Sequence, residues 1–200
     1  MDFNFFNRMS ISILVVLFSP VLLLAGEPTE RIKATTDKLI EIVSNPQLDP
    51  PEMAEKRARM IRAAVDEVFD WAAFSQRAMG KHWRKLTPVQ KKEFIESFGQ
   101  LLERTYMDKT RQYSGEKMEF LTEDIEGAYG SVEAEVILKN GAKVAVEYRV
   151  MKRNGTWFVY DVYVEGVSLV NNYRVQFNNI ITRSSYEELL RRLKSKLDEE

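Results

Sequence analysis

The fold is decided by residues 129–164, YGSVEAEVILKNGAKVAVEYRVMKRNGTWFVYDVYV, where apolar and polar side chains alternate along the chain. Alternation with a period of two is typical of a β-strand that buries one face. Two Asn-Gly pairs, Asn140-Gly141 and Asn154-Gly155, interrupt the alternation, and this dipeptide favours tight turns between antiparallel strands. The stretch therefore predicts two consecutive β-hairpins.

The length of each turn decides which side chains share a face. A two-residue loop at Asn140-Gly141 would place Ala134 opposite Glu147 and mix apolar with charged side chains. A three-residue loop with a left-handed glycine, used at both turns, instead pairs Val136 with Val144, Ala134 with Val146, Val132 with Tyr148, Val150 with Phe158, Tyr148 with Tyr160, and Val146 with Val162. We therefore expect one apolar face and one charged face, with a fourth strand around residues 117–121 pairing beyond Val132.

Helical periodicity precedes and follows the strands, at residues 29–45, 52–65, 69–79, 88–114 and 169–180 and again from 184 onward. The clearest helix start is Thr87-Pro88-Val89-Gln90, which can form a capping box. Ser168 is a candidate cap for the helix after the sheet. Ser184 and Glu187 form a second candidate capping box, followed by Glu187–Arg191 and Glu188–Arg192 pairs. The pattern predicts an α+β fold, an antiparallel meander of about four strands whose apolar face is covered by N-terminal and C-terminal helices.

The first 26 residues have the pattern of a secretory signal peptide. Arg8 precedes an apolar run at residues 11–24, and Ala25-Gly26 follows before the polar Glu27. We expect cleavage there and a single domain over residues 27–200, although an uncleaved membrane anchor stays open. The absence of cysteine excludes a lipoprotein anchor.

The composition narrows the available chemistry. The 200 residues include 29 Lys and Arg, 30 Asp and Glu, one His and no Cys. A thiolate nucleophile, a disulfide and a Cys-ligated zinc site are excluded, and a single imidazole cannot build a multi-His metal site. The net charge of -1 gives no electrostatic reason to expect nucleic-acid binding. We therefore expect no cofactor, no metal and no nucleic-acid partner.

Individual candidates for catalysis are weak. His82 lies in a basic segment without a nearby carboxylate to orient it, and we interpret it as an exposed histidine without a catalytic role. Ser168 lacks the Gly-x-Ser-x-Gly context of a nucleophile elbow. Asp161, inside a strand, is expected to form a cross-strand ion pair with Arg149. We predict no catalytic residue, although an enzyme that uses Asp161 and Arg149 in a pocket stays open.

Two features exceed what folding alone requires. Residues 77–92 contain six basic side chains and no acidic one, around the start of the long helix. This run is either a docking surface for an acidic partner or an anionic head group, or a solvated turn. Large aromatic side chains also follow the helices and strands that should face one another, and these either fill a core or line a pocket.

Residues 159–177, VYDVYVEGVSLVNNYRVQF, resemble the signature of the MlaC family, the toluene-tolerance or Ttg2D-like group of periplasmic phospholipid-binding proteins. Other residues match that family in order and spacing, namely Val68-Phe69-Asp70, Met79-Gly80, Trp83, Thr87-Pro88-x-Gln90, Phe94, Phe98, Leu101-Leu102, Tyr106 and Gly155-x-Trp157. The resemblance extends over about residues 29–193.

The resemblance implies a non-enzymatic carrier in the Gram-negative periplasm that holds a phospholipid in an apolar cavity between sheet and helices. The implied partners are an outer-membrane lipoprotein–porin complex and an inner-membrane Mla ABC transporter complex, between which lipid moves to maintain outer-membrane asymmetry. We expect a monomer. An exported adaptor or binding domain with a filled core and no lipid is the alternative.

The predicted strand register and helix faces give a specific hypothesis for the pocket. Its lining is predicted to be Phe94, Phe98, Leu102, Tyr106, Val144, Val146, Tyr148, Phe158, Tyr160, Val162, Tyr173 and Phe177. Four basic residues are candidates for contact with the head group or a partner, Lys81, Arg84, Lys85 and Arg174.

Overall fold

The structure is a computed structural model that describes residues 27–111 and 115–198, so the predicted signal peptide lies outside the described residues. The helices within these ranges are α1 (Glu27–Val43), α2 (Ala54–Val68), α3 (Trp71–Met79), α4 (Pro88–Arg111), α5 (Leu169–Arg183) and α6 (Tyr186–Asp198), with the short 3-10 segments η1 (Pro46–Leu48), η2 (Pro51–Met53) and η3 (Gly80–Lys85). The strands are β1 (Lys117–Glu126), β2 (Tyr129–Ile137), β3 (Lys143–Arg153), β4 (Thr156–Val164) and β5 (Val167–Ser168). None of the described helices combines the length and the apolar character needed to span a bilayer.

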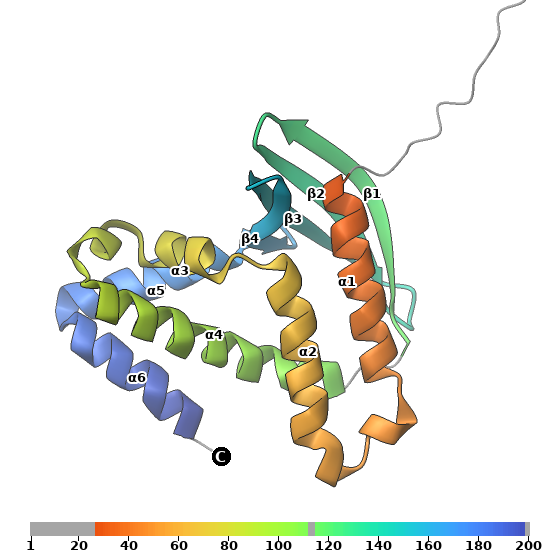
Figure 1. Ribbon diagram of the computed structural model, residues 1–200, viewed down its shortest axis with the longest axis horizontal. Coiled ribbons are helices and arrows are strands. Elements are labelled where there is room, and N and C mark those ends of the chain that lie inside the picture. The colour runs from red at the N-terminus through yellow and green to blue at the C-terminus, as the bar shows by residue number, and fades with distance from the viewer. Residues whose placement is uncertain (1–26, 112–114, 199–200) are drawn as a thin grey trace, which may run out of the picture.

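The strands form one antiparallel sheet in the order β1-β2-β3-β4-β5, so the predicted α+β meander is confirmed (Figure 1). The strand count is five where about four were expected, because the two residues of β5 pair with the end of β4. The predicted strand near residues 117–121 is β1, and it pairs with β2 as expected. Figure 1 shows α1 running along the sheet, with α3, α5 and α6 grouped around α4 at the other end of the molecule.

The predicted register of the first hairpin is confirmed. Val136 lies opposite Val144, Ala134 opposite Val146, and Val132 opposite Tyr148. Gly141 adopts a left-handed φ of 81°, as a three-residue turn requires. The apolar residues of β2 and β3 therefore share one face, which we call the inner face of the sheet.

The predicted register of the second hairpin is wrong. Arg153 pairs with Thr156, which leaves a two-residue turn in which Asn154 and Gly155 both have positive φ, at 52° and 81°. This turn matches the twist of the strands, and it places Val150 opposite Val159 in place of Phe158. A bulge at Tyr160 then restores the alternation, so that Tyr148 lies opposite Val162.

The helix starts follow the predicted capping chemistry with one correction. The backbone N–H of Thr87 donates to Gln90 Oε1 at 2.9 Å, and the Gln90 N–H donates to Thr87 Oγ1 at 3.2 Å, which confirms the capping box. Ser168 Oγ accepts from the Asn171 N–H at 2.9 Å, so that predicted cap is confirmed too.

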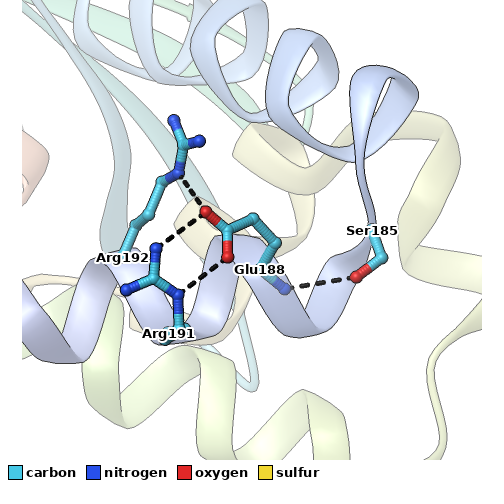
Figure 2. A network of polar contacts seen from close by, with 4 residues as sticks. All are labelled: Ser185, Glu188, Arg191 and Arg192. Carbon is cyan, nitrogen blue, oxygen red and sulfur yellow. Dashed lines mark hydrogen bonds and ion pairs between the residues drawn. The ribbon is translucent and has the colours of Figure 1, made fainter.

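The cap of α6 is Ser185 and not Ser184, because the Ser184 N–H still bonds to Ile180 O in the preceding helix. Ser185 Oγ accepts from the Glu188 N–H at 3.2 Å (Figure 2). Glu188 also binds Arg191 at 2.8 Å and Arg192 at 2.7 Å, so the expected Glu188–Arg192 pair is present. Arg191 pairs with Glu188 in place of Glu187.

The apolar core is divided into two main clusters. One lies among α3, α4, α5 and α6, where Phe94 and Phe98 are fully buried. The other lies between the sheet, α1 and the end of α2, around Ile32, Val132 and Val150. A smaller cluster joins α1 to α2. The N-terminal helices α1 and α2 therefore cover the sheet as expected, whereas α4 and the C-terminal helices α5 and α6 form a core largely of their own with α3.

Candidate functional site

One end of the inner face is closed. Val132, Val150 and Val159 are at most 1% exposed, and they pack with Ile32 of α1 and Val68 of α2. The chain between α2 and α3 also holds this end of β4 in place, because the Asp70 N–H donates to the Val159 carbonyl at 2.9 Å. This half of the face is ordinary protein core.

The other end of the same face is open. Phe120 on β1, Val136 on β2, and Val144 and Tyr148 on β3 are only half-buried, and Val164 at the end of β4 is 37% exposed. Cross-strand pairing places all five on one face. A half-covered apolar sheet surface beside a well-packed core is a candidate binding surface for an apolar ligand.

Tyr148 lies at the border between the closed and the open part of the inner face, opposite the buried Val132. Its hydroxyl donates to the sulfur of Met118 at 3.7 Å, and Met118 also receives the hydroxyl of Thr36 on α1 at 3.8 Å. Burial raises the pKa of Tyr148 to about 12. Sulfur is a weak acceptor, so the hydroxyl is held in surroundings that offer little polar compensation.

The predicted helical lining of the pocket lies elsewhere. Phe94, Phe98, Leu102 and Phe177 are buried in the helical cluster with Tyr173 packed against it. The Phe98 ring centroid lies 5.0 Å from that of Phe177 and 4.9 Å from that of Tyr173. These side chains contact one another and are not brought together with the sheet residues. The side chain of Tyr106 lies outside the described residues.

Among the predicted sheet residues, Val144, Val146, Tyr148 and Val162 lie on the inner face, whereas Phe158 and Tyr160 do not. The two-residue turn and the bulge turn these two aromatic side chains outward, where Phe158 meets Arg153 and Tyr160 meets Arg77, whose guanidinium lies 4.0 Å from the ring centroid. Sequence reasoning missed Phe120 and Val136 as members of the open surface. Their place in the alternation of β1 and β2 was the available signal.

The candidates for catalysis have structural partners. Asp161 is buried, and it accepts hydrogen bonds from the Val162 N–H at 2.8 Å, the Ser168 hydroxyl at 2.6 Å and the Val170 N–H at 3.1 Å. The expected Asp161–Arg149 ion pair is not formed, because Arg149 binds Glu147 at 2.7 Å. The ring of His82 is half-buried, and its Nε2 lies 3.1 Å from Asn178 Oδ1. Across residues 27–111 and 115–198, no group of three or more acidic or histidine side chains is arranged to hold a metal ion.

The hollows on the described surface include one beside α1 and one beside α5. The larger, of about 660 Å³, lies between the start of α1 and the β3–β4 turn and is lined by charged residues that include Glu27, Lys38 and Glu67. Ion pairs Lys38–Glu67 at 2.6 Å and Lys152–Glu27 at 2.9 Å occupy its walls. It contains none of the residues predicted to contact lipid.

The smaller hollow, of about 350 Å³, lies between η3 and α5 and includes Lys81, His82 and Arg174 in its lining. Arg84 and Lys85 are exposed on the same 3-10 segment. The structure therefore brings together the four basic residues that the sequence singled out. The segment between α3 and α4 that carries three of them lies at the end of the helices away from the sheet (Figure 1).

Comparison with solved structures places this architecture in a known class. A phospholipid-binding protein from Ralstonia solanacearum, solved in complex with a phospholipid, has the same fold with a TM-score of 0.78 and 25% sequence identity. The similarity covers 87% of this chain and 100% of that one. The family described as MlaC protein matches residues 33–195, and the chain therefore belongs to the MlaC family.

Two relatives give the extent of the sequence similarity. The intermembrane phospholipid transport system binding protein MlaC of Haemophilus influenzae is 23% identical over 122 residues, which cover 58% of this chain and 57% of that protein. The toluene tolerance protein ttg2D of Pseudomonas putida is 26% identical over 185 residues, which cover 88% of this chain and 83% of that protein. The match thus spans little more than half the length of the Haemophilus relative.

Proposed function

We propose that this protein is a phospholipid carrier that holds acyl chains against the open half of the inner sheet face. The observation that carries the proposal is the incompletely buried apolar surface formed by Phe120, Val136, Val144, Tyr148 and Val164. The names of its relatives, a phospholipid-binding protein and an intermembrane phospholipid transport protein, support the same ligand.

The physical requirement for such a carrier is modest. Each CH₂ group removed from water contributes about 0.8 kcal/mol, so a two-chain lipid does not cross an aqueous space unaided at a useful rate. Transfer from a bilayer to a protein exchanges one apolar environment for another, which leaves a small net affinity and permits release. A carrier needs an apolar surface and no reactive group, in agreement with the structural roles of Asp161 and Ser168.

The finer parts of the proposal concern place and partners. The protein acts in the periplasm, without catalysis and as a monomer, and moves phospholipid between the outer-membrane lipoprotein–porin complex and the inner-membrane Mla ABC transporter complex. This movement maintains lipid asymmetry of the outer membrane. The family membership supports this part of the proposal.

Native mass spectrometry of residues 27–200, purified without detergent from a Gram-negative host, tests the ligand. We expect an added mass that matches a phospholipid, and a solvent extract of the same sample should contain that lipid. If the protein carries no added mass and also fails to take lipid from vesicles, the carrier function is rejected. That result would favour an adaptor with a filled core, in agreement with the packed rings of Phe94, Phe98 and Phe177.

A further inference from the structure

The segment η3 and the neighbouring face of α5 form a basic surface with unusual charge composition. Lys81, Arg84, Lys85 and Arg174 are exposed, and none of the four forms an ion pair with a carboxylate of the described residues. Elsewhere the exposed bases often have such partners, as in Lys33–Asp37, Lys143–Glu135 and Lys194–Glu93. We call these four residues the basic surface.

The basic surface is held in a defined shape. Arg174 Nε donates to the Arg77 carbonyl at 2.8 Å, which anchors the α5 side chain against the end of α3. Gly80 lies directly against this side chain, since a Cβ at that position would be in van der Waals contact with Arg174 Cδ at 3.4 Å. The φ of Gly80 is +56°, in the region that favours glycine. His82 is likewise fixed by Asn178 at 3.1 Å.

Between these groups lies the hollow of about 350 Å³, with Lys81, His82, Arg174 and Asn178 as polar lining and Met79 and Val175 as apolar walls. A carboxylate side chain that enters it would meet two permanent cations. Its methylene groups would contact the apolar walls. The hollow therefore suits a glutamate or aspartate side chain of a protein partner, which has both a charge and methylene groups, better than it suits a small inorganic anion.

Two properties separate this surface from a membrane-binding site and from a head-group site. The apolar side chains that protrude beside it are Val89 and Val175, 75% and 53% exposed, while the one tryptophan on η3, Trp83, is half-buried under Lys91. Interfacial membrane binding relies on protruding Trp, Phe or Leu. The open sheet surface, where acyl chains are proposed to lie, is at the other end of the molecule (Figure 1).

We propose that the basic surface docks an acidic surface of a protein partner, and that the hollow between η3 and α5 receives one of the partner's carboxylates. This inference rests on the proposed function, because a carrier must dock at the complexes that load and unload it. It adds the location of the docking surface and the chemistry of the partner.

The test measures binding of the full mature chain to the purified inner-membrane Mla complex and to the purified outer-membrane lipoprotein–porin complex of the same organism. The variant K81E/R84E/K85E should lose about tenfold or more in affinity for at least one complex, since three attractions become repulsions. R174Q, which keeps a donor for the Arg77 carbonyl but removes the charge, should lose several-fold. Added salt should weaken the wild-type complex and abolish the difference between the variants.

A matched control reverses Lys56, Lys117 and Lys139, which are exposed on other faces and form no ion pair within the described residues. K56E/K117E/K139E changes net charge by the same amount and should bind as the wild type does. Equal binding by all variants, or an equal loss in the control, would overturn the docking proposal. If the wild type binds neither complex, the proposed partner complexes are rejected, and the docking proposal is rejected with them.

Two further measurements test whether the basic surface binds a membrane or a lipid head group in place of a protein. Vesicles of phosphatidylethanolamine and phosphatidylglycerol should not distinguish K81E/R84E/K85E from the wild type, whereas loss of vesicle binding with intact binding to both complexes would assign the surface to the membrane instead. Native mass spectrometry should find the same bound lipid in both proteins. Loss of lipid from the variant would make the surface a head-group site and reject protein docking there.

Discussion

The hydroxyl of Ser168 donates a 2.6 Å hydrogen bond to Oδ2 of Asp161, and both side chains are buried. Ser168 Oγ in turn accepts from the Asn171 N–H, so one carboxylate on β4 positions the cap of α5. Oδ1 of the same carboxylate accepts from the Val170 N–H in the first turn of that helix. Asp161 therefore fixes the direction in which the chain leaves the sheet.

We expect Asp161→Ala to lower the free energy of unfolding by about 3 kcal/mol, because it leaves buried donors at Ser168 and Val170 without an acceptor. Ser168→Ala should cost about 1 kcal/mol, the typical effect of losing a helix cap. Urea unfolding followed by circular dichroism measures both changes. Glu147→Ala, which removes a partly exposed ion pair, is the control and should change stability by less than about 1 kcal/mol. A D161A protein as stable as the wild type would refute this role.

The two faces of β3 give a sharp test of the lipid site. Val144 lies half-buried on the inner face, and Ala145 beside it in sequence is exposed on the outer face. Val144→Lys should abolish lipid co-purification, because an ammonium group on the acyl-chain surface must remain hydrated. Ala145→Lys adds the same side chain one residue away and should retain lipid.

Native mass spectrometry of both variants provides the measurement, with circular dichroism to show that each is folded. Lipid in V144K at the wild-type level would place the acyl chains elsewhere. Loss of lipid from both variants would show a general effect of charge on the sheet and would remove the assignment to the inner face.

The start of α6 predicts a specific response to acid. Hydrogen bonds from Arg191 and Arg192 lower the pKa of Glu188 to about 2, from an ordinary value of 4.5 (Figure 2). A depressed pKa in the folded state means that the ionised carboxylate stabilises the fold above pH 4.5, and that this contribution is lost as the pH falls towards 2. Glu188→Gln should therefore be less stable than the wild type at neutral pH and equally stable near pH 2.

Thermal melts of both proteins across this pH range measure the effect, which is small because the pair is exposed to solvent. Glu41→Gln is the control, since Glu41 is exposed on α1 and forms no ion pair within the described residues. A difference between E188Q and the wild type that persists unchanged at pH 2 would show that the ion pairs are not its cause.

Local chemistry made the helix starts and the first hairpin predictable. Thr87 and Gln90 satisfy each other's backbone N–H groups with no contribution from distant residues. The register at Asn140-Gly141 followed from the alternation on both sides of it. The second hairpin was not predictable in this way, because its two-residue turn needs a bulge at Tyr160 to keep the apolar residues on one face, and alternation alone does not predict a bulge.

The candidate site was predictable from the sequence only on the sheet. Val144, Val146, Tyr148 and Val162 were assigned to the correct face, since strand parity fixes the direction of each side chain. The helical stripe of Phe94 and Phe98 was equally clear in the sequence, but periodicity does not say which element covers a stripe. In the structure α3, α5 and α6 cover it, and the rings fill a separate core.

Two tyrosines can report where lipid binds. Burial raises the pKa of both Tyr148, on the open sheet surface, and Tyr186, in the helical cluster, to about 12. A raised pKa means that the neutral phenol stabilises the fold below pH 10, and that this contribution is lost as the pH rises through 12. Absorbance titration should therefore show both ionising above the ordinary tyrosine pKa of 10, with Tyr148→Phe and Tyr186→Phe assigning the two signals. Acyl chains on the open surface would exclude water from Tyr148 but not from Tyr186, whose hydroxyl donates to the Gln90 carbonyl at 2.9 Å.

Loading the delipidated protein with phospholipid should thus delay the ionisation of Tyr148 alone. A delay confined to Tyr186 would instead place the lipid among the helices, where the sequence had located half of the pocket.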